Sequence, residues 1–409
     1  MITIKPRVGI ISKCPSCDMD LVIYDNIIFQ GVHICYEGFC PKCQKTFLQN
    51  LPIGQGKLVS LSLTKFEKKE EKKSNISWFF DPFRRIYQNP KSDEISFEII
   101  KRRPTKNKVV LLNTLDNCYG HSLLYFLNLQ NIIDQKQSDT SIVVLIQPFL
   151  LWLLPDNGID EIWLAHVSFS QMREYLVDLN KKINIELLRF DTVQLSQAHL
   201  CPTDIRIEKF SKIVPYDFVS PPEKPRISFI WRDDLTRLWI KSHWIYSAMR
   251  KLRIAKILLP LHFLRVLCFV SFLHYKFGNR FQITLTGLGK TCKFPSFIAD
   301  ERVEKFNKET EIHCSKIYAQ SILAIGVHGS GMILPSAHAG MTISIMPMKR
   351  WGNFAEDILF SENDTRLAAF QKRVIPMNTS LFETLDICEN MLTGRSYFIK
   401  KFIYDKTVL

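Results

Sequence analysis

Several features that identify common protein classes are missing from this sequence. Residues 1–11 hold no apolar run long enough for the core of a signal peptide, so we expect a cytoplasmic protein. No segment recurs at the periods of roughly 20–50 residues that mark solenoid repeats. No RNA- or DNA-binding module is evident, and eleven cysteines are too sparse over 409 residues for a disulfide framework. The sequence thus excludes solenoids and small disulfide-stapled secreted proteins.

The composition indicates a globular chain with an excess of positive charge. Hydrophobic residues make up 46% and charged residues 23%, which excludes bulk disorder. At ~100–200 residues per domain, this length predicts two or three domains. Lys plus Arg number 54 and Asp plus Glu 40, so the net charge is 54 − 40 = +14. That excess favours an anionic partner, which is a nucleic acid, an anionic membrane face or a phosphorylated ligand.

Two Cys-x-x-Cys pairs lie near the N-terminus, with 22 residues between them. They are formed by Cys14, Cys17, Cys40 and Cys43. Short β-like runs at 21–30 and 31–37 separate the pairs. Four thiolates on two tight turns suit tetrahedral zinc, and a module this small needs the metal for its folding energy. Because four thiolates leave no open coordination position, we predict a structural zinc ribbon over 1–63, with a redox dithiol as the minor alternative.

The rest of the chain predicts two α/β halves. The charge run KFEKKEEKK indicates a linker or a solvated helix, and we place a charged linker at 64–105. Beyond it, apolar runs typical of buried parallel strands alternate with helical patterns. The predicted strands are 108–113, 141–147, 160–166 and 183–190, then 226–231, 282–287, 322–329 and 341–346, and the predicted helices are 121–129, 170–180 and 300–308. The fold class is therefore α/β, with two Rossmann-like doubly wound domains at 106–220 and 221–409, the second closing with a C-terminal helix.

The apolar segment 254–273 is about as long as a membrane span. It contains Lys256 and Arg265, each costing about 2.5–3.5 kcal/mol at mid-bilayer, and Pro260, which would kink it. We therefore expect an internal helix of a globular domain. A basic helix that lies on an anionic membrane, with contact through residues 250–276, is the second interpretation, and a true span the third.

The motif IGVHGSGM (325–332) follows an apolar strand and precedes a helical segment. Gly329 and Gly331 would let the backbone approach a ligand closely, and His328 and Ser330 offer hydrogen bonds. Its spacing fits neither the GxGxxG dinucleotide fingerprint nor a P-loop. A diphosphate held at the following helix start is the functional hypothesis, and a glycine turn that serves only packing is the alternative.

A second motif, WRDDLTR, directly follows the strand 226–231. Arg232 and Arg237 could grip phosphate oxygens, because guanidinium groups pair with them bidentately. The alternative is an internal ion pair with Asp233 or Asp234.

Further candidates follow other predicted strands. His121, at a loop-to-helix start after 108–113, is a candidate base for a hydroxyl acceptor, or else a structural histidine. Gly287 and Gly289, at and just beyond the end of the strand 282–287, are further donor-binding candidates. Asp300 and Glu356 are carboxylates that we expect near the same sheet edge, where they would hold sugar hydroxyls or serve as ordinary helix N-terminal acids.

In their order, GHSLLYFLN, ISFIWRDDLTR and GVHGSGM resemble family 61-type glycosyltransferases over roughly residues 106–375. The resemblance implies a GT-B-like fold and transfer of a sugar from a nucleotide-sugar donor to a hydroxyl, without a bound metal at the catalytic centre. It does not cover the cysteine ribbon or the charged linker. The sequence departs from the family pattern by Ser330 in place of alanine and by a long insertion at about 240–277.

Carried over to this sequence, the resemblance implies donor binding by Arg232, His328, Gly329, Ser330 and Gly331. His121 would face the acceptor, which we expect to be a glycan or lipid-linked molecule of bacterial surface polysaccharide assembly on the inner membrane face. His121 is the first candidate base, with Asp300 or Glu356 as alternatives.

Two other classes compete with this interpretation. A zinc-ribbon nucleic-acid-binding protein would explain the positive charge, but the basic residues are dispersed and interleaved with acids, which makes a nucleic acid the least favoured partner. A non-catalytic scaffold, in which the ribbon docks a partner, would keep the fold without the chemistry.

Overall fold

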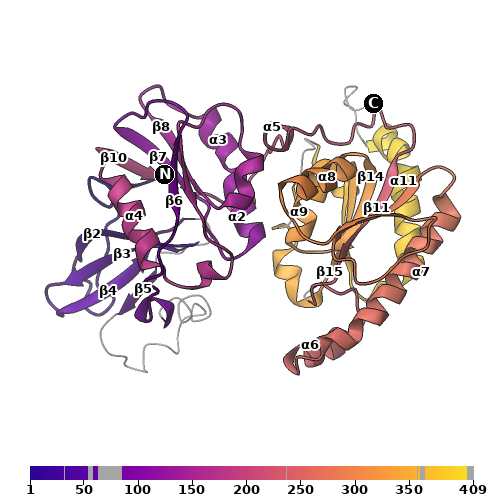
Figure 1. Ribbon diagram of the computed structural model, residues 1–409, viewed down its shortest axis with the longest axis horizontal. Helices are drawn as coiled ribbons and strands as arrows, with labels where there is room; N and C mark the ends of the chain where they lie inside the picture. Colours follow the sequence, from indigo (N-terminus) through magenta and orange to yellow (C-terminus); the bar gives the residue numbers. More distant parts are fainter. Residues whose placement is uncertain are drawn as a thin grey trace. The chain divides into compact units, whose positions relative to one another are not determined.

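The computed structural model describes residues 1–31, 33–53, 59–62, 85–235, 237–356, 358–359 and 364–402. The chain divides into two compact units, Met1–Pro202 and Thr203–Leu409, each with its own core (Figure 1). The first unit contains a four-stranded and a six-stranded sheet, and the second contains a six-stranded sheet. The predicted fold class is confirmed: two Rossmann-like doubly wound halves with a cysteine ribbon at the N-terminus.

The ribbon is an antiparallel sheet whose strands follow chain order. It consists of β2 (Val22–Gln30), β3 (His33–Cys40), β4 (Lys45–Asn50) and β5 (Val59–Ser62). The strands expected at 21–30 and 31–37 are β2 and β3. One end of the sheet packs around the cysteines with Leu21 and Phe47, while Phe29 and Tyr36 at the other end join the core of the neighbouring large sheet. The ribbon therefore shares a hydrophobic core with the rest of its unit.

The large sheet of the first unit has the order β1-β10-β7-β8-β9-β6. Its strands are β1 (Ile2–Lys5), β6 (Phe97–Lys101), β7 (Lys108–Asn113), β8 (Ser141–Ile146), β9 (Glu161–Ala165) and β10 (Thr192–Leu195). The four central strands are parallel, and β1 and β6 are antiparallel edges. The predictions at 108–113, 141–147 and 160–166 are confirmed as β7, β8 and β9.

The helices of this unit correct one strand prediction. They are α2 (Tyr119–Leu127), α3 (Leu129–Asp134) and α4 (Val177–Leu187). The segment 183–190, expected as a strand, lies largely in α4. The buried residues Leu179, Ile183 and Leu187 of α4 are four apart, which is the spacing of one helix face. The strand prediction is therefore wrong, because the apolar residues of this segment follow a helical periodicity.

The expected linker, 64–105, is only partly described. Residues 63–84 lie outside the described part of the chain. At the far end of the range, β6 pairs with β9 and completes the sheet. At the other boundary of the predicted domains, β1 falls in the range assigned to the ribbon but pairs with β10 of the large sheet.

The C-terminal sheet has the strand order β13-β12-β11-β14-β15-β16, and every pairing is parallel. Its strands are β11 (Arg226–Arg232), β12 (Gln282–Leu288), β13 (Ala299–Val303), β14 (Ser321–Val327), β15 (Met341–Met346) and β16 (Lys372–Pro376). Numbered within the unit, this is the dinucleotide-binding order 3-2-1-4-5-6. The order in which successive strands are added therefore reverses between β11 and β14, and such sheets bind ligands at this switch point, beyond the carboxyl ends of the strands.

Helices cover this second sheet. They are α5 (Glu208–Ser211), α6 (His243–Lys251), α7 (Leu259–Phe277), α8 (Lys308–Ala319), α9 (Ile333–His338), α10 (Thr365–Gln371) and the expected C-terminal helix, α11 (Leu381–Phe402). The helix predicted at 300–308 is wrong: residues 299–303 form the edge strand β13, and α8 begins only at Lys308 behind the N-cap Asn307. The acidic residues there were mistaken for a helix N-terminus.

Within the described part of the chain, one helix is long and apolar enough, by length and composition, to cross a membrane. It covers Ala255–Phe277, and a third of its most apolar window is buried. The buried face of α7 carries Val266, Phe269, Val270 and Leu273, which pack into the core of the C-terminal sheet. On this face α7 packs inside the domain, as expected for an internal helix. Much of the rest of the surface of segment 255–277 is exposed.

Candidate functional site

The switch point of the C-terminal sheet brings the two sharpest motifs together. Ile230 of β11 pairs with Gly326 of β14, so Arg232 and His328 leave neighbouring strands at the same edge. Beyond Val327, the chain forms a 3-10 turn at Ser330–Met332 before α9. The loop His328–Gly331 therefore lies beside the segment Arg232–Arg237, as the sequence predicted for residues at the carboxyl ends of strands.

The two arginines lie against the two glycines of the loop. Arg237 is so close to Gly329 that a Cβ there would overlap its guanidinium. A Cβ on Gly331 would lie 3.2 Å from both Cδ and Nη1 of Arg232. Gly329 also has a φ of +145°, a conformation that side chains disfavour. The glycines thus leave room for arginine side chains at the loop, which a simple packing turn would not need.

His328 is completely buried beside this positive charge. Burial lowers its pKa to about 4, a hydrogen bond with the Asn353 backbone opposes the shift, and the positive charges of Arg350 and Arg237 add to it. The imidazole is therefore neutral at pH 7. It contributes hydrogen-bonding capacity to the loop, while Arg237 and Arg350 contribute the charge.

The two aspartates of the arginine motif contact different partners. Arg232 forms an ion pair with Asp234, so the ion-pairing alternative holds for this residue. Asp233 lies over Gly289, where a Cβ would overlap its carboxylate, and Gly289 has a φ of +106°. Gly287 instead lies against the backbone oxygen of Trp231, which makes it a packing position between β12 and β11.

Asp300 forms an ion pair with Arg302. It lies on β13 opposite Leu285, three residues before the carboxyl end of the strand. Its carboxylate accepts hydrogen bonds from Arg302 Nε (2.8 Å) and Nη2 (2.7 Å). Despite the opposing effect of burial, Arg302 holds the pKa of Asp300 below its usual range. Arg302 is itself buried and packs over Trp231 and Phe294, so this pair stabilises the sheet edge.

Glu356 is linked to the glycine loop through Asn353. Its Oε2 accepts a hydrogen bond from Asn353 Nδ2 (2.6 Å), and the Asn353 backbone contacts His328. Glu356 is thus one residue removed from the buried histidine. Arg350 and Asn353, which follow β15, complete this side of the site, and the sequence pattern RWGN was the available signal for them.

In the N-terminal unit, His121 lies in the first turn of α2, which follows β7. Its Nδ1 lies 3.4 Å from Asp116 Oδ1. Asp116 is buried, its Oδ1 accepts a hydrogen bond from the Cys118 backbone (2.7 Å), and its own backbone donates to Gln147 Oε1 (3.1 Å). Sequence reasoning missed Asp116, although an acid just past a strand end was a usable signal. A carboxylate that orients a half-exposed histidine is the arrangement of a general base.

The tip of the ribbon hairpin reaches this same loop. Asn113 Nδ2 donates to the backbone oxygen of Gly31 (3.0 Å), and Asn113 Oδ1 accepts from the Leu115 backbone (3.1 Å). Gly31 has a φ of +56°, and a Cβ on it would lie 3.6 Å from Asp116 Cα. The hairpin therefore supports the loop that carries Asp116.

The four cysteines form a cluster at the other end of the ribbon. Their Sγ atoms all lie within 4.8 Å of one another, with Cys14–Cys43 at 3.9 Å and Cys17–Cys40 at 3.5 Å. A tetrahedron with metal–sulfur bonds of ~2.3 Å has sulfurs about 3.8 Å apart, so the donor set fits zinc. Both turns are alike: Asp18 and Gln44, in left-handed conformation, donate to the backbone oxygens of Cys14 and Cys40.

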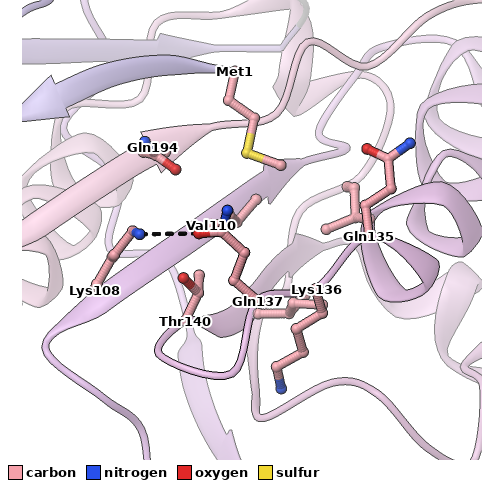
Figure 2. Close-up of a pocket in the computed structure, with 10 residues that line it drawn as sticks. Met1, Lys108, Val110, Gln135, Lys136, Gln137, Thr140 and Gln194 are labelled. Carbon is pink, nitrogen blue, oxygen red and sulfur yellow. Dashed lines mark hydrogen bonds between the residues drawn. The ribbon is translucent and has the colours of Figure 1, made fainter.

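A pocket of about 460 Å³ lies away from these residues, on the N-terminal unit (Figure 2). It opens beside the amino ends of β7 and β8, where Lys108 Nζ donates to Gln137 Oε1 (3.2 Å). Parallel sheets place their reactive groups at the opposite, carboxyl edge. We therefore assign no chemistry to this pocket.

Comparison with known proteins identifies no family for this chain. No family model matches the sequence, and no curated protein matches it. Among solved structures, the chain is similar to the ADP-heptose LPS heptosyltransferase II of E. coli, with a TM-score of 0.36 and 10% identity. The match covers 71% of this chain and 99% of that one. So weak a likeness carries no argument about activity, which therefore depends on the residues described above.

Proposed function

We propose that this protein is a glycosyltransferase that moves a sugar from a nucleotide-sugar donor to a hydroxyl acceptor. One observation carries the proposal: at the switch point of a sheet with dinucleotide-binding topology, Arg232 and Arg237 lie against the glycines of the His328–Gly331 loop. Two guanidinium groups over an open backbone match the shape and charge of a diphosphate.

In this proposal, the arginines act on the leaving group. As the bond from the anomeric carbon to the donor phosphate breaks, the nucleoside diphosphate leaves with the electron pair. Negative charge then grows on the bridging oxygen, and fixed positive groups there lower the barrier. Arg237 and Arg350 flank the neutral His328, so the loop offers both charge and hydrogen bonds to the departing group. The ion pair between Arg232 and Asp234 keeps the first arginine in place before the donor binds.

The acceptor hydroxyl must lose a proton as its oxygen bonds to the anomeric carbon. We assign this proton to His121, because the buried carboxylate of Asp116 lies beside its Nδ1 and orients the ring. The pair with Arg302 makes Asp300 a poor base, since it holds the carboxylate in its ionised, low-pKa form. Glu356 remains the second candidate through its bond to Asn353.

The pathway belongs to the same proposal. A cytoplasmic enzyme of bacterial surface polysaccharide or glycan assembly would meet nucleotide sugars where they are made. Its acceptor would be a glycan or a lipid-linked molecule on the inner membrane face. Thiolate ligation of zinc by the ribbon is consistent with a reducing compartment.

A panel of UDP-, GDP-, CMP- and ADP-sugars, scored for hydrolysis and transfer, tests the proposal. Turnover of one nucleotide class by the wild-type chain, and its loss in R232Q, supports a glycosyltransferase. If no donor is turned over and none raises the melting temperature, the chain is a scaffold. Salt-sensitive oligonucleotide binding in place of nucleotide-sugar binding would favour the nucleic-acid-binding alternative.

A further inference from the structure

A long stretch of the C-terminal unit contains no acidic residue. Between Asp234 and Asp300, residues 235–299 include eleven lysines and arginines and no Asp or Glu. Their net charge of 11 − 0 = +11 is most of the +14 of the whole chain. The excess charge is therefore concentrated in one segment, which contains α6 and α7, and the expectation that the basic residues are dispersed among acids is wrong for this segment.

This segment also exposes large apolar side chains. The exposed fraction is 81% for Trp244, 67% for Leu252 and 62% for Ile257. We define the basic–apolar surface by its exposed apolar residues Trp244, Ile245, Leu252, Ile257, Leu261 and Leu264. Its basic members are Arg250, Lys251, Arg253 and Lys256, all of them exposed. Figure 1 shows α6 at the outer end of α7, projecting from the sheet.

The charges of this surface differ from those further along α7. Lys276 pairs with Glu389 (2.6 Å), and Arg265 donates to the Thr379 backbone oxygen (2.8 Å) while packing over Trp239. Among the described residues, no carboxylate lies within ion-pair distance of the four basic members of the surface. Exposed Trp and aliphatic side chains are unfavourable in water, and together with the neighbouring positive charges they match an anionic lipid interface.

The surface is coupled to the arginine motif. Tyr246 Oη on α6 donates to the Leu235 backbone oxygen (2.6 Å). Leu238, Ile240, Tyr246 and Leu258 form one buried cluster, so α6 packs on the segment that directly follows Arg237. A partner bound to the basic–apolar surface would therefore be connected through this buried cluster to the segment that follows Arg237.

We propose that the basic–apolar surface binds the anionic face of a lipid bilayer, with Trp244 and its apolar neighbours inserted at the interface. The buried face of α7 stays in the protein core, so the chain lies on the membrane through this helix pair and does not cross it there. Charge complementarity selects the anionic bilayer. The apolar residues distinguish it from a nucleic acid, whose phosphates would be met by the basic residues alone.

Co-sedimentation of the full chain with vesicles tests this directly. We expect binding to phosphatidylcholine vesicles containing 30% phosphatidylglycerol, weak binding to pure phosphatidylcholine, and partial loss in high salt. The double variant W244Q/I257Q should bind at least tenfold less. R253E/K256E should lose more than tenfold, at ~5-fold per basic residue removed. Val219 is as exposed as Trp244, so V219Q serves as the apolar control, and K305E/K316E as the charge control, both binding like the wild type.

Two results would overturn the proposal. One is equal vesicle binding by W244Q/I257Q and the wild type. The other is a wild-type chain that binds an oligonucleotide but no vesicles, together with loss of that oligonucleotide binding in R253E/K256E. Nucleotide-sugar binding by W244Q/I257Q in vesicle-free buffer is measured in parallel, so that failure of the membrane proposal remains separate from failure of the proposed reaction.

Discussion

The guanidinium of Arg237 lies directly over Gly329, in the space that any side chain at residue 329 would occupy. Gly331 stands in the same relation to Arg232 at a slightly larger distance. The two motifs, almost a hundred residues apart in the chain, thus form one site in which each arginine depends on a glycine opposite it. This dependence makes the site testable by small substitutions.

Replacing Gly329 with alanine should displace Arg237 and strain the loop, because φ is +145° there. We expect a loss of roughly 1–3 kcal/mol in stability and a larger loss in nucleoside diphosphate affinity. Calorimetric titration and urea unfolding measure the two effects. A Cβ added to Gly352 would meet no atom of the described residues within 4 Å, so G352A is the matched control. Unchanged nucleotide affinity in G329A would contradict the site.

Replacing Arg237 with glutamine removes the charge and keeps most of the side-chain length. A charge-assisted hydrogen bond to phosphate is worth about 1.5–3 kcal/mol, so kcat/KM should fall roughly 10–100-fold. R366Q is the control, because Arg366 pairs with the nearby Asp364 at an exposed helix start. Equal losses in the two variants would mean that Arg237 acts on the fold and not on the donor.

Asp116 should matter through His121. In D116N the imidazole loses its carboxylate partner, so kcat should fall and the acid limb of the pH–rate profile should move. D139N, at an exposed carboxylate paired with Lys108, should keep the wild-type profile. A wild-type profile in D116N would remove His121 as the base.

The ribbon should hold one zinc ion per chain, measurable by elemental analysis. C17S should lose the metal, whereas C201S, at an exposed cysteine outside the cluster, should keep it. Because Phe29 and Tyr36 join the core of the large sheet, metal loss should lower the melting temperature of the whole N-terminal unit. A metal-free protein with an unchanged melting temperature would contradict the structural role.

Buried histidines should make the fold acid-sensitive. Burial lowers the pKa of His262 to about 3 and that of His338 to about 4. Below pH 6.5 these histidines bind protons in the unfolded chain but stay neutral in the folded chain. The free energy of unfolding therefore falls as the pH drops from 6.5 towards 4. The limiting slope is about 1.4 kcal/mol per pH unit for each histidine. Urea unfolding between pH 7.5 and 4.5 measures it, and H338Q should flatten the curve.

The sequence predicted those elements whose signal is local. Buried parallel strands such as Lys108–Asn113 are continuous apolar runs, and their boundaries follow from the polar residues on either side. Short or half-exposed edge strands such as Ala299–Val303 have no such run, because the positions that face solvent can be polar. The segment 183–190 failed for a different reason, since Ile183 and Leu187 bury one face of a helix with the apolar content of a strand.

The site was predictable in part for the same reason. Strand ends are visible in sequence, so Arg232, His328 and the loop glycines could be predicted to lie at one edge of the sheet, where the structure places them. The partner of each residue depends on the tertiary structure. Arg302 pairs with Asp300, and Asp116 contacts His121, and no local sequence pattern specifies either contact. The carboxylates could therefore be named from the sequence as candidates but not separated by role.

Calorimetric titration of the wild-type chain and R232Q/R237Q with UDP, GDP, CMP and ADP tests the central claim most directly. We predict that one of these nucleotides binds the wild type in the micromolar range and binds the double variant at least 100-fold more weakly, with both proteins equally folded. Binding of the same nucleotide with equal affinity to both proteins, or of none to the wild type, would contradict the assignment of the arginine–glycine site to a nucleotide-sugar donor.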